Sequence, residues 1–194
     1  PGGGVGVVTR DALGYAILDV SHGATFESVT IRSANASLPL LTVVYRPPST
    51  NANKCIEEFS DMLSLLLLYK RAIIITGDFN FHIDNCNDKS AIPFLDTCYT
   101  FGLAQHVKEP THRNGHTLDL VLSSDVPVAD LKVCPLTPSD HFFVSFETQG
   151  TFLSKPSTNV TWQRDIRSIN KFDLLSSLND SGLLYPNPSV FNQP

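Results

Sequence analysis

Apolar residues fall in short runs along the chain, and most of these runs have the spacing of β-strands. The segment FESVTIRS, residues 26–33, alternates polar and apolar side chains, as a half-buried strand does. The segment LPLLTVVYRPP, residues 38–48, is too apolar to be half exposed and predicts a central strand that its two prolines end. The remaining predicted strands are GVGVVTR (4–10), YAILDV (15–20), RAIIITGDFN (71–80), HTLDLVLSS (116–124), DLKVCPL (130–136) and HFFVSFET (141–148).

Two segments have helical rather than strand periodicity. In residues 53–70, apolar side chains recur every three or four positions, and Asn51 or Asn53 can cap the helix. Residues 90–102 predict a second helix that ends at Gly102, followed by a short extended piece. Strands interleaved with two helices indicate an α/β layered sandwich.

The pattern changes after Thr148. Residues 149–159, QGTFLSKPSTN, have no period and predict a linker. Residues 165–184 predict a helix that ends at Gly182, before a tail rich in Pro and Asn. We therefore expect one domain over residues 1–148 and a linker with a partly helical tail over 149–194, leading toward a downstream region.

Composition narrows the function classes. Hydrophobic residues make up 42% of the chain and charged residues 17%, which is typical of a globular protein. The net charge of −5 excludes nucleic-acid binding by bulk electrostatics alone, so a polyanionic substrate would require a bound cation. The four cysteines form no close pair, which argues against a thiolate metal cluster. No apolar run is long enough to span a membrane.

The end of the predicted strand at residues 71–80 is the first candidate for chemistry. Asp78 and Asn80 share one side of the chain if the extended conformation continues past Gly77. Carboxylate and carboxamide oxygens are hard ligands suited to Mg²⁺. The alternative is an ordinary strand-to-turn junction in which both side chains bond the local backbone.

A second group surrounds the start of the last predicted strand. His141 can act as a general base or bind a phosphate, and the adjacent Asp140 can approach a metal. If the face of the strand that carries Asp119 is buried, this carboxylate requires a partner, and His141 would serve. The alternatives are a loop at residues 139–141 that hydrogen-bonds to itself and an Asp119 exposed to solvent.

Tyr45 and Arg46 close the predicted central strand just before the two prolines. A phenol and a planar guanidinium at this point can hold a phosphate. The alternative is an aromatic lid on the core beside a surface arginine.

Four segments in this order, VVYRPP, GDFN, TLDLVL and SDH, resemble the endonuclease/exonuclease/phosphatase superfamily. The likeness is greatest to the apurinic-type endonuclease domain of non-LTR retrotransposons. The resemblance implies a four-layered α/β sandwich, in which helices flank two packed mixed β-sheets. It also implies cleavage of phosphodiester bonds with Mg²⁺ or Mn²⁺ as cofactor, DNA as the partner and a nuclear location for the ancestral activity; it implies no membrane association and no particular protein partner.

The resemblance also implies roles for single residues. Asp78 and Asn80 are expected to handle the attacking water and the scissile phosphate, and His141 to contact this phosphate or help to activate water. Asp119 is expected to hold the His141 ring. The other expected contacts are Asp140 near the metal and Tyr45, Arg46 and Ser139 at the substrate.

One departure from the family pattern concerns the metal. Relatives carry a metal-binding Glu and a metal-proximal Asn upstream of the first segment matched here, so we expect a domain incomplete at its N-terminus. Glu27 has the right side chain but lies in the wrong predicted strand. The leading interpretation is a fragment of a retrotransposon-type nicking endonuclease; the alternatives are a catalytically inactive remnant or binding module and a phosphatase of the same superfamily.

Overall fold

The computed structural model describes residues 4–148 and Ser176. Their secondary structure confirms most of the predicted elements. In chain order these are a 3₁₀ turn (Asp11–Leu13), β1 (Tyr15–His22), β2 (Glu27–Ser33), β3 (Leu40–Tyr45), α1 (Ala52–Leu67), β4 (Ile73–Asp78), α2 (Ala91–Thr100), β5 (Ala104–Gln105), β6 (Asp119–Ser124), β7 (Val128–Cys134) and β8 (Phe143–Thr148).

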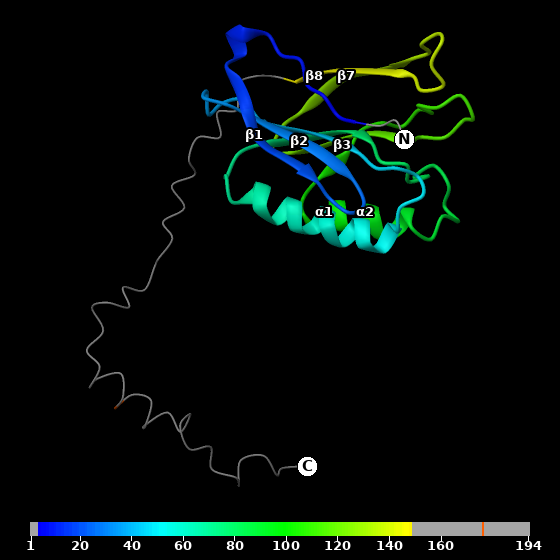
Figure 1. Ribbon diagram of the computed structural model, residues 1–194, viewed down its shortest axis with the longest axis horizontal. Helices are drawn as coiled ribbons and strands as arrows, with labels where there is room; N and C mark the ends of the chain where they lie inside the picture. Colours follow the sequence, from blue (N-terminus) through cyan, green and yellow to red (C-terminus); the bar gives the residue numbers. More distant parts are fainter. Residues whose placement is uncertain (1–3, 149–175, 177–194) are drawn as a thin grey trace. The chain divides into compact units, whose positions relative to one another are not determined.

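The strands form one large mixed sheet and one small sheet. The large sheet has the order β1-β2-β3-β4-β6-β5, and the small one pairs β7 with β8. Among the strand pairs of residues 4–148, only β3–β4 is parallel, and α1 supplies the crossover between these two strands. Figure 1 shows the two helices below the large sheet and the β7–β8 hairpin above it.

Aromatic packing fills the layer between the large sheet and the helices. Phe59 of α1, Phe94 of α2 and the segment after β4 contribute rings that are at most 1% exposed, and Phe81 stacks on Phe94 at 4.5 Å. Asn51 begins α1 by accepting a hydrogen bond from the Lys54 backbone N–H. The buried rings of Phe79 and Phe81 anchor the segment after β4 to this core.

The α/β fold is confirmed, and three of the four expected layers lie within the described residues: two helices, the large sheet and the small sheet. The strand predicted at residues 4–10 is wrong, because this segment is irregular and Val8 is fully exposed. Its alternating pattern has no neighbouring strand to pair with in the described part of the chain.

The predicted linker and tail at residues 149–194 lie outside the described residues, apart from Ser176. Contacts divide the chain into residues 1–153 and 154–194, and every element named above belongs to the first unit. No helix among the described residues is long and apolar enough to cross a membrane.

Candidate active site

The ends of three neighbouring strands place polar side chains in one row. Tyr45 of β3 pairs in register with Asp78 of β4, and Asp78 pairs with Asp119 of β6. Register partners lie on the same face of a sheet, and Ile73 and Ile75 of β4 pack in the core with α1. Asp78 has the opposite parity in β4, so this row lies on the face away from the helices. Gly77 permits the close approach of β3 and β4, because a Cβ atom there would lie 1.9 Å from the Val44 carbonyl oxygen.

Asp78 and Asn80 meet through a turn rather than through a continued strand. The strand β4 ends at Asp78, and Asn80 has a left-handed backbone with φ of +50°. Asp78 Oδ1 accepts the Asn80 backbone N–H at 3.1 Å, and Asp78 Oδ2 accepts the Asn80 Nδ2–H at 2.9 Å. The extended conformation therefore continues past Gly77 only as far as Asp78 and does not include Asn80, but the turn still brings the two side chains together.

His141 is held by a carboxylate, as its sequence context predicts. Its Nδ1 lies 2.8 Å from Asp119 Oδ2, and its Nε2 lies 4.0 Å from Asp78 Oδ2. The Thr111 hydroxyl accepts the Asp119 backbone N–H at 2.9 Å, and Ser139 Oγ accepts the His141 backbone N–H at 3.0 Å. Thr111 and Ser139 thus fix the backbone of the pair. We call Asp78, Asn80, Asp119 and His141 the strand-end cluster.

Electrostatic interactions shift the protonation of this cluster. Burial, together with the negative charge of Asp119, raises the pKa of Asp78 to about 6, against the opposing effect of His141 and of two hydrogen bonds from Asn80. Burial alone would lower the pKa of His141. The hydrogen bond to Asp119 and the charges of Asp119, Asp78 and Asp140 outweigh burial, so the pKa of His141 is raised. The cluster therefore concentrates negative charge in a largely buried place.

Asp140 lies beside the cluster rather than within it. Its carboxylate is exposed and lies 3.6 Å from Nε2 of His112. His112 forms an isolated antiparallel bridge with His141, and the two rings lie 5.0 Å apart. The sequence interpretation missed His112, because only the fold brings the loop before β6 against the start of β8.

Arg46 does not occupy the position expected of a phosphate ligand. Its side chain is only 4% exposed and lies 4.2 Å over the Phe81 ring. Its guanidinium donates to the backbone carbonyl oxygens of Phe79, Asn80 and Thr50. Arg46 therefore braces the turn that carries Asn80, and its backbone carbonyl oxygen accepts the Asn80 Nδ2–H at 2.8 Å.

Glu27, the side chain considered for the missing metal-binding Glu, lies apart from the strand-end cluster. Glu27 pairs in register with Tyr45, so it belongs to the same row of the sheet. It lies two strands from Asp78, about 10 Å by the usual strand spacing. Glu27 is therefore outside the group of ligand atoms formed by Asp78, Asp119 and His141, which lie within 4.8 Å of one another.

The donor atoms of the strand-end cluster fit a hard divalent cation. Asp78 and Asp119 offer carboxylate oxygens, and both nitrogen-bound protons of the Asn80 amide have acceptors, which leaves Oδ1 for a ligand. Burial and the negative charge of Asp119 raise the pKa of Asp78, and a bound cation would oppose both effects by favouring the carboxylate. Asp78, Asn80 and Asp119 are the residues that would hold Mg²⁺ or Mn²⁺.

A second group of possible metal ligands, which the sequence interpretation also missed, contains His82, Asp84 and His116. It joins the loop after β4 to the loop before β6. The H-x-D spacing after GDFN and the His before TLDLVL were visible in the sequence, but nothing in it indicates that these two loops touch.

Sequence comparison decides the family. Residues 40–145, more than half of the 194-residue chain, match the family described as endonuclease-reverse transcriptase. The chain belongs to this family. The match runs from the start of β3 into the first part of β8 and includes the whole strand-end cluster, and it confirms the predicted kinship with the endonuclease/exonuclease/phosphatase superfamily.

A solved structure shares the fold of this family member. The endonuclease domain of TRAS1, a telomere-specific non-LTR retrotransposon, superimposes with a TM-score of 0.54 at 20% identity, over 68% of this chain and 67% of that one. An endonuclease/exonuclease/phosphatase family protein from Bacteroides thetaiotaomicron gives 0.48 at 16% identity, over 69% and 63%. A mannosyl-6-phosphatase from Bacteroides thetaiotaomicron VPI-5482 gives 0.44 at 15% identity, over 70% and 67%. No protein of curated function matches the chain.

Proposed function

We propose that the chain is a divalent-metal-dependent phosphodiester hydrolase, a DNA-nicking endonuclease of the retrotransposon type. One observation carries the proposal: Asp119 holds one nitrogen of His141 at 2.8 Å while Asp78 lies 4.0 Å from the other nitrogen. This arrangement orients the His141 imidazole between two carboxylates, at the edge of the sheet where β4 ends and β6 begins.

Asp119 determines which nitrogen of His141 meets the substrate. The hydrogen bond to Asp119 places a proton on Nδ1, which leaves Nε2 as the acceptor on the side of Asp78. Of Asp78 and His141, His141 is the member that does not hold the ion, and its raised pKa suits it to take a proton near neutral pH. We assign the proton lost by the attacking water to Nε2 of His141.

Water would attack the phosphorus, and the bond from phosphorus to the 3′ oxygen would break. The products would be a 3′-hydroxyl, once the leaving oxygen takes up a proton, and a 5′-phosphate. When bound, Mg²⁺ or Mn²⁺ neutralises the charge that develops on the phosphate oxygens. Asp78, Asn80 and Asp119 would hold this ion, and Tyr45 lies in the same row, where its phenol can meet the phosphate.

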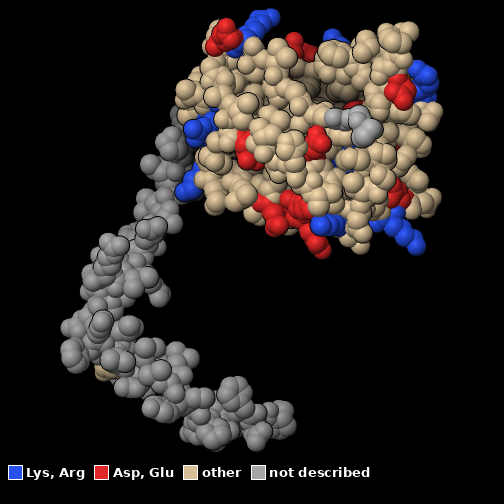
Figure 2. Space-filling model, in the orientation of Figure 1, with Lys and Arg blue, Asp and Glu red and all other residues tan. Residues whose placement is uncertain are grey.

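The surface charge supports a dependence on the cation. On the face drawn in Figure 2, Lys and Arg side chains lie toward the edges and do not gather into one basic patch. With a net charge of −5, the chain depends on local neutralisation at the cleavage site.

Nicking of supercoiled plasmid by the 194-residue chain tests the proposal. We expect open-circular product with Mg²⁺ or Mn²⁺ and none with EDTA, and the nicks should prime a DNA polymerase directly because they end in a 3′-hydroxyl. Hydrolysis of a phosphomonoester, such as a sugar phosphate, should be slower by orders of magnitude. Absence of nicking with either metal, or release of inorganic phosphate as the main reaction, would contradict the proposal.

A further inference from the structure

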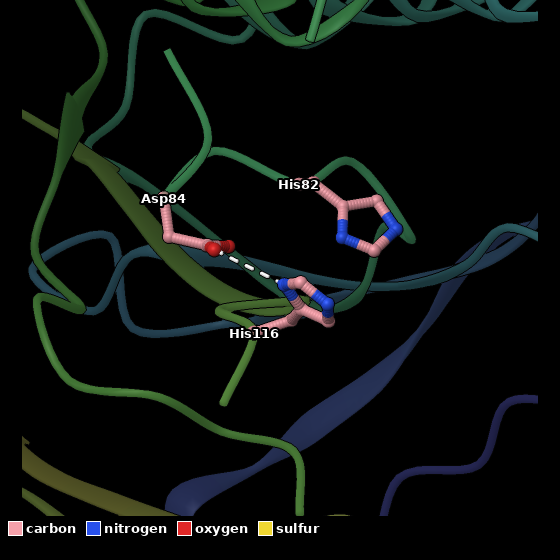
Figure 3. Close-up of side chains that lie close together, drawn as sticks. All are labelled: His82, Asp84 and His116. Carbon is pink, nitrogen blue, oxygen red and sulfur yellow. Dashed lines mark hydrogen bonds and ion pairs between the residues drawn. The ribbon is translucent and has the colours of Figure 1, made fainter. Parts of the chain in front are cut away.

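Three side chains outside the strand-end cluster converge between two loops. His82 and Asp84 follow β4, and His116 precedes β6; Figure 3 shows Asp84 and His116 directed toward each other, with His82 beside them. The Nδ1 atom of His116 lies 3.1 Å from Asp84 Oδ2, and the rings of His82 and His116 lie 4.3 Å apart. We call these three residues the loop cluster.

The core holds the first loop in place. Phe81 is fully buried, and Ile83 packs against the hydrophobic core. Phe81 and Ile83 flank His82, and Asp84 follows directly, so both candidate ligands lie on a backbone that the core holds in place.

Hydrogen bonds hold the second loop equally firmly. The carbonyl oxygen of His116 accepts the backbone N–H groups of Thr111 and His112 at 2.9 and 3.0 Å. Asp84 Oδ1 accepts the Thr117 backbone N–H at 2.9 Å. The carboxylate is thus oriented by a partner that is not itself a candidate ligand, as metal-binding carboxylates commonly are.

The three ligand atoms lie within 4.8 Å of one another. Around an ion bound at about 2.0–2.2 Å, tetrahedral ligand atoms lie roughly 3.4 Å apart, so small side-chain rotations would close the site. The Asp84 and His116 side chains are both partly exposed, which leaves an entry path and room for water as a further ligand.

We propose that the loop cluster binds a divalent transition-metal ion of the Zn²⁺ class through His82, Asp84 and His116. Two imidazoles and one carboxylate suit Zn²⁺, Co²⁺, Ni²⁺ or Fe²⁺, whereas Mg²⁺ prefers sites made of oxygen atoms alone. The ion would clamp the loop that carries Asn80 to the loop that leads into Asp119. This site is independent of the proposed nuclease function.

A second group with the same residue types contains His112, Asp140 and His141. It is the weaker candidate, because His141 Nδ1 is already engaged by Asp119 and the Asp140 carboxylate is 65% exposed. The test therefore uses a His112→Gln background, in which only the loop cluster retains two histidines and one aspartate.

The proposal is tested by titrating the metal-free 194-residue chain that carries His112→Gln with Co²⁺. Binding is followed by the visible d–d absorption of Co²⁺. We expect one Co²⁺ per chain that Zn²⁺ displaces and millimolar Mg²⁺ does not; Co²⁺ bound by the strand-end cluster should leave when Mg²⁺ is added. His82→Ala and His116→Ala should each weaken binding by at least about tenfold, whereas His22→Ala, which removes an exposed histidine, should not. Equal binding by all these variants would overturn the proposal.

A measurement on the unsubstituted chain guards against variants that misfold. Bound Co²⁺ broadens the NMR signals of nearby nuclei. At substoichiometric Co²⁺, the ring signals of His82 and His116 should broaden before those of the other four histidines. Broadening that begins at His112 and His141, or at none of the six, would contradict the assignment.

Discussion

The strand-end cluster and the loop cluster use the same residue types in different surroundings. In the first, the Asp78 and Asp119 side chains are 18% and 22% exposed, and a sheet register fixes them. In the second, the Asp84 and His116 side chains are 30% and 37% exposed, and two loops hold them. Both clusters pair a carboxylate with an imidazole at about 3 Å.

The protonation of the carboxylates separates the two clusters. Burial and a neighbouring negative charge raise the pKa of Asp78 to about 6. Burial also acts on Asp84, but the Thr117 N–H and His116 outweigh it and lower the pKa of this carboxyl. A carboxyl with a strongly raised pKa, such as Asp78, is typical of catalytic sites. A carboxylate stabilised by hydrogen bonds, such as Asp84, suits a structural role or a bound transition metal.

The largest expected effect concerns Asp78→Asn, which should reduce nicking by at least about 10³-fold while stabilising the fold. Folding raises the pKa of Asp78 above its unfolded value, so the charged carboxylate opposes folding at neutral pH. We expect a gain of about 1 kcal/mol in the free energy of unfolding at pH 7, since lost hydrogen bonds from Asn80 offset part of the relief.

This gain should be largest above pH 6 and disappear below about pH 4, where Asp78 is protonated in both folded and unfolded chains. Urea unfolding of the metal-free proteins at several pH values measures it. A loss of stability at pH 7, or a gain that does not depend on pH, would remove the electrostatic contrast between the clusters.

Asp119→Asn should lower the nicking rate by about 10²-fold or more without unfolding the chain, because it disturbs the tautomer of His141. Asp119 also helps to raise the pKa of His141, so its loss should move the acidic limb of the pH–rate profile to lower pH. Rates measured from pH 5 to 9 check both effects. A parental nicking rate together with an unchanged acidic limb of the pH–rate profile would contradict the pairing of Asp119 with His141.

Ser139→Ala should have a smaller effect, because Ser139 acts through the His141 backbone N–H and does not reach the ring. We expect a decrease in nicking of up to about tenfold, as loss of one hydrogen bond predicts. Ser139→Thr, which keeps the hydroxyl, should restore the rate. A loss as large as that of Asp119→Asn would mean that Ser139 contacts the substrate directly.

The smallest effect belongs to the loop cluster. Without transition metal, Asp84→Asn should cost about 0.5–1 kcal/mol in the free energy of unfolding at pH 7, as expected for a partly exposed carboxylate. Its lowered pKa means that this contribution is present above about pH 4 and is lost as the pH falls further. Nicking with Mg²⁺ should change less than tenfold; a larger decrease would make the loop cluster part of the active site.

The periodicity of the chain was sufficient to predict both helices and most of the strands. Alternation at residues 26–33 and the apolar run at 38–48 each correspond to a strand, β2 and β3, because burial on one or two faces leaves a direct pattern. The pairing of Asp119 with His141 was predicted for a buried Asp119, because a buried carboxylate without a partner is costly. An exposed Asp119 was the alternative, and the 2.8 Å hydrogen bond to His141 decides for the pairing.

Long-range loop contacts were not predictable. Arg46 was expected to bind a phosphate. The sequence around Arg46 did not reveal the three backbone carbonyl oxygens that accept hydrogen bonds from its guanidinium. His112 and the loop cluster were missed because residues more than 20 positions apart meet only once the sheet has formed. The segment 4–10 has strand periodicity without a partner in the described residues, and periodicity alone cannot supply one.

The most direct test of the central claim is a comparison of all six single His→Ala variants in one Mg²⁺-dependent plasmid-nicking assay. If the strand-end cluster cuts DNA, His141→Ala should lose at least about 10³-fold, and His22→Ala, His82→Ala and His116→Ala should stay within tenfold of the parental rate. Retained nicking by His141→Ala, or an equal loss in His116→Ala, would contradict the assignment of catalysis to the strand-end cluster.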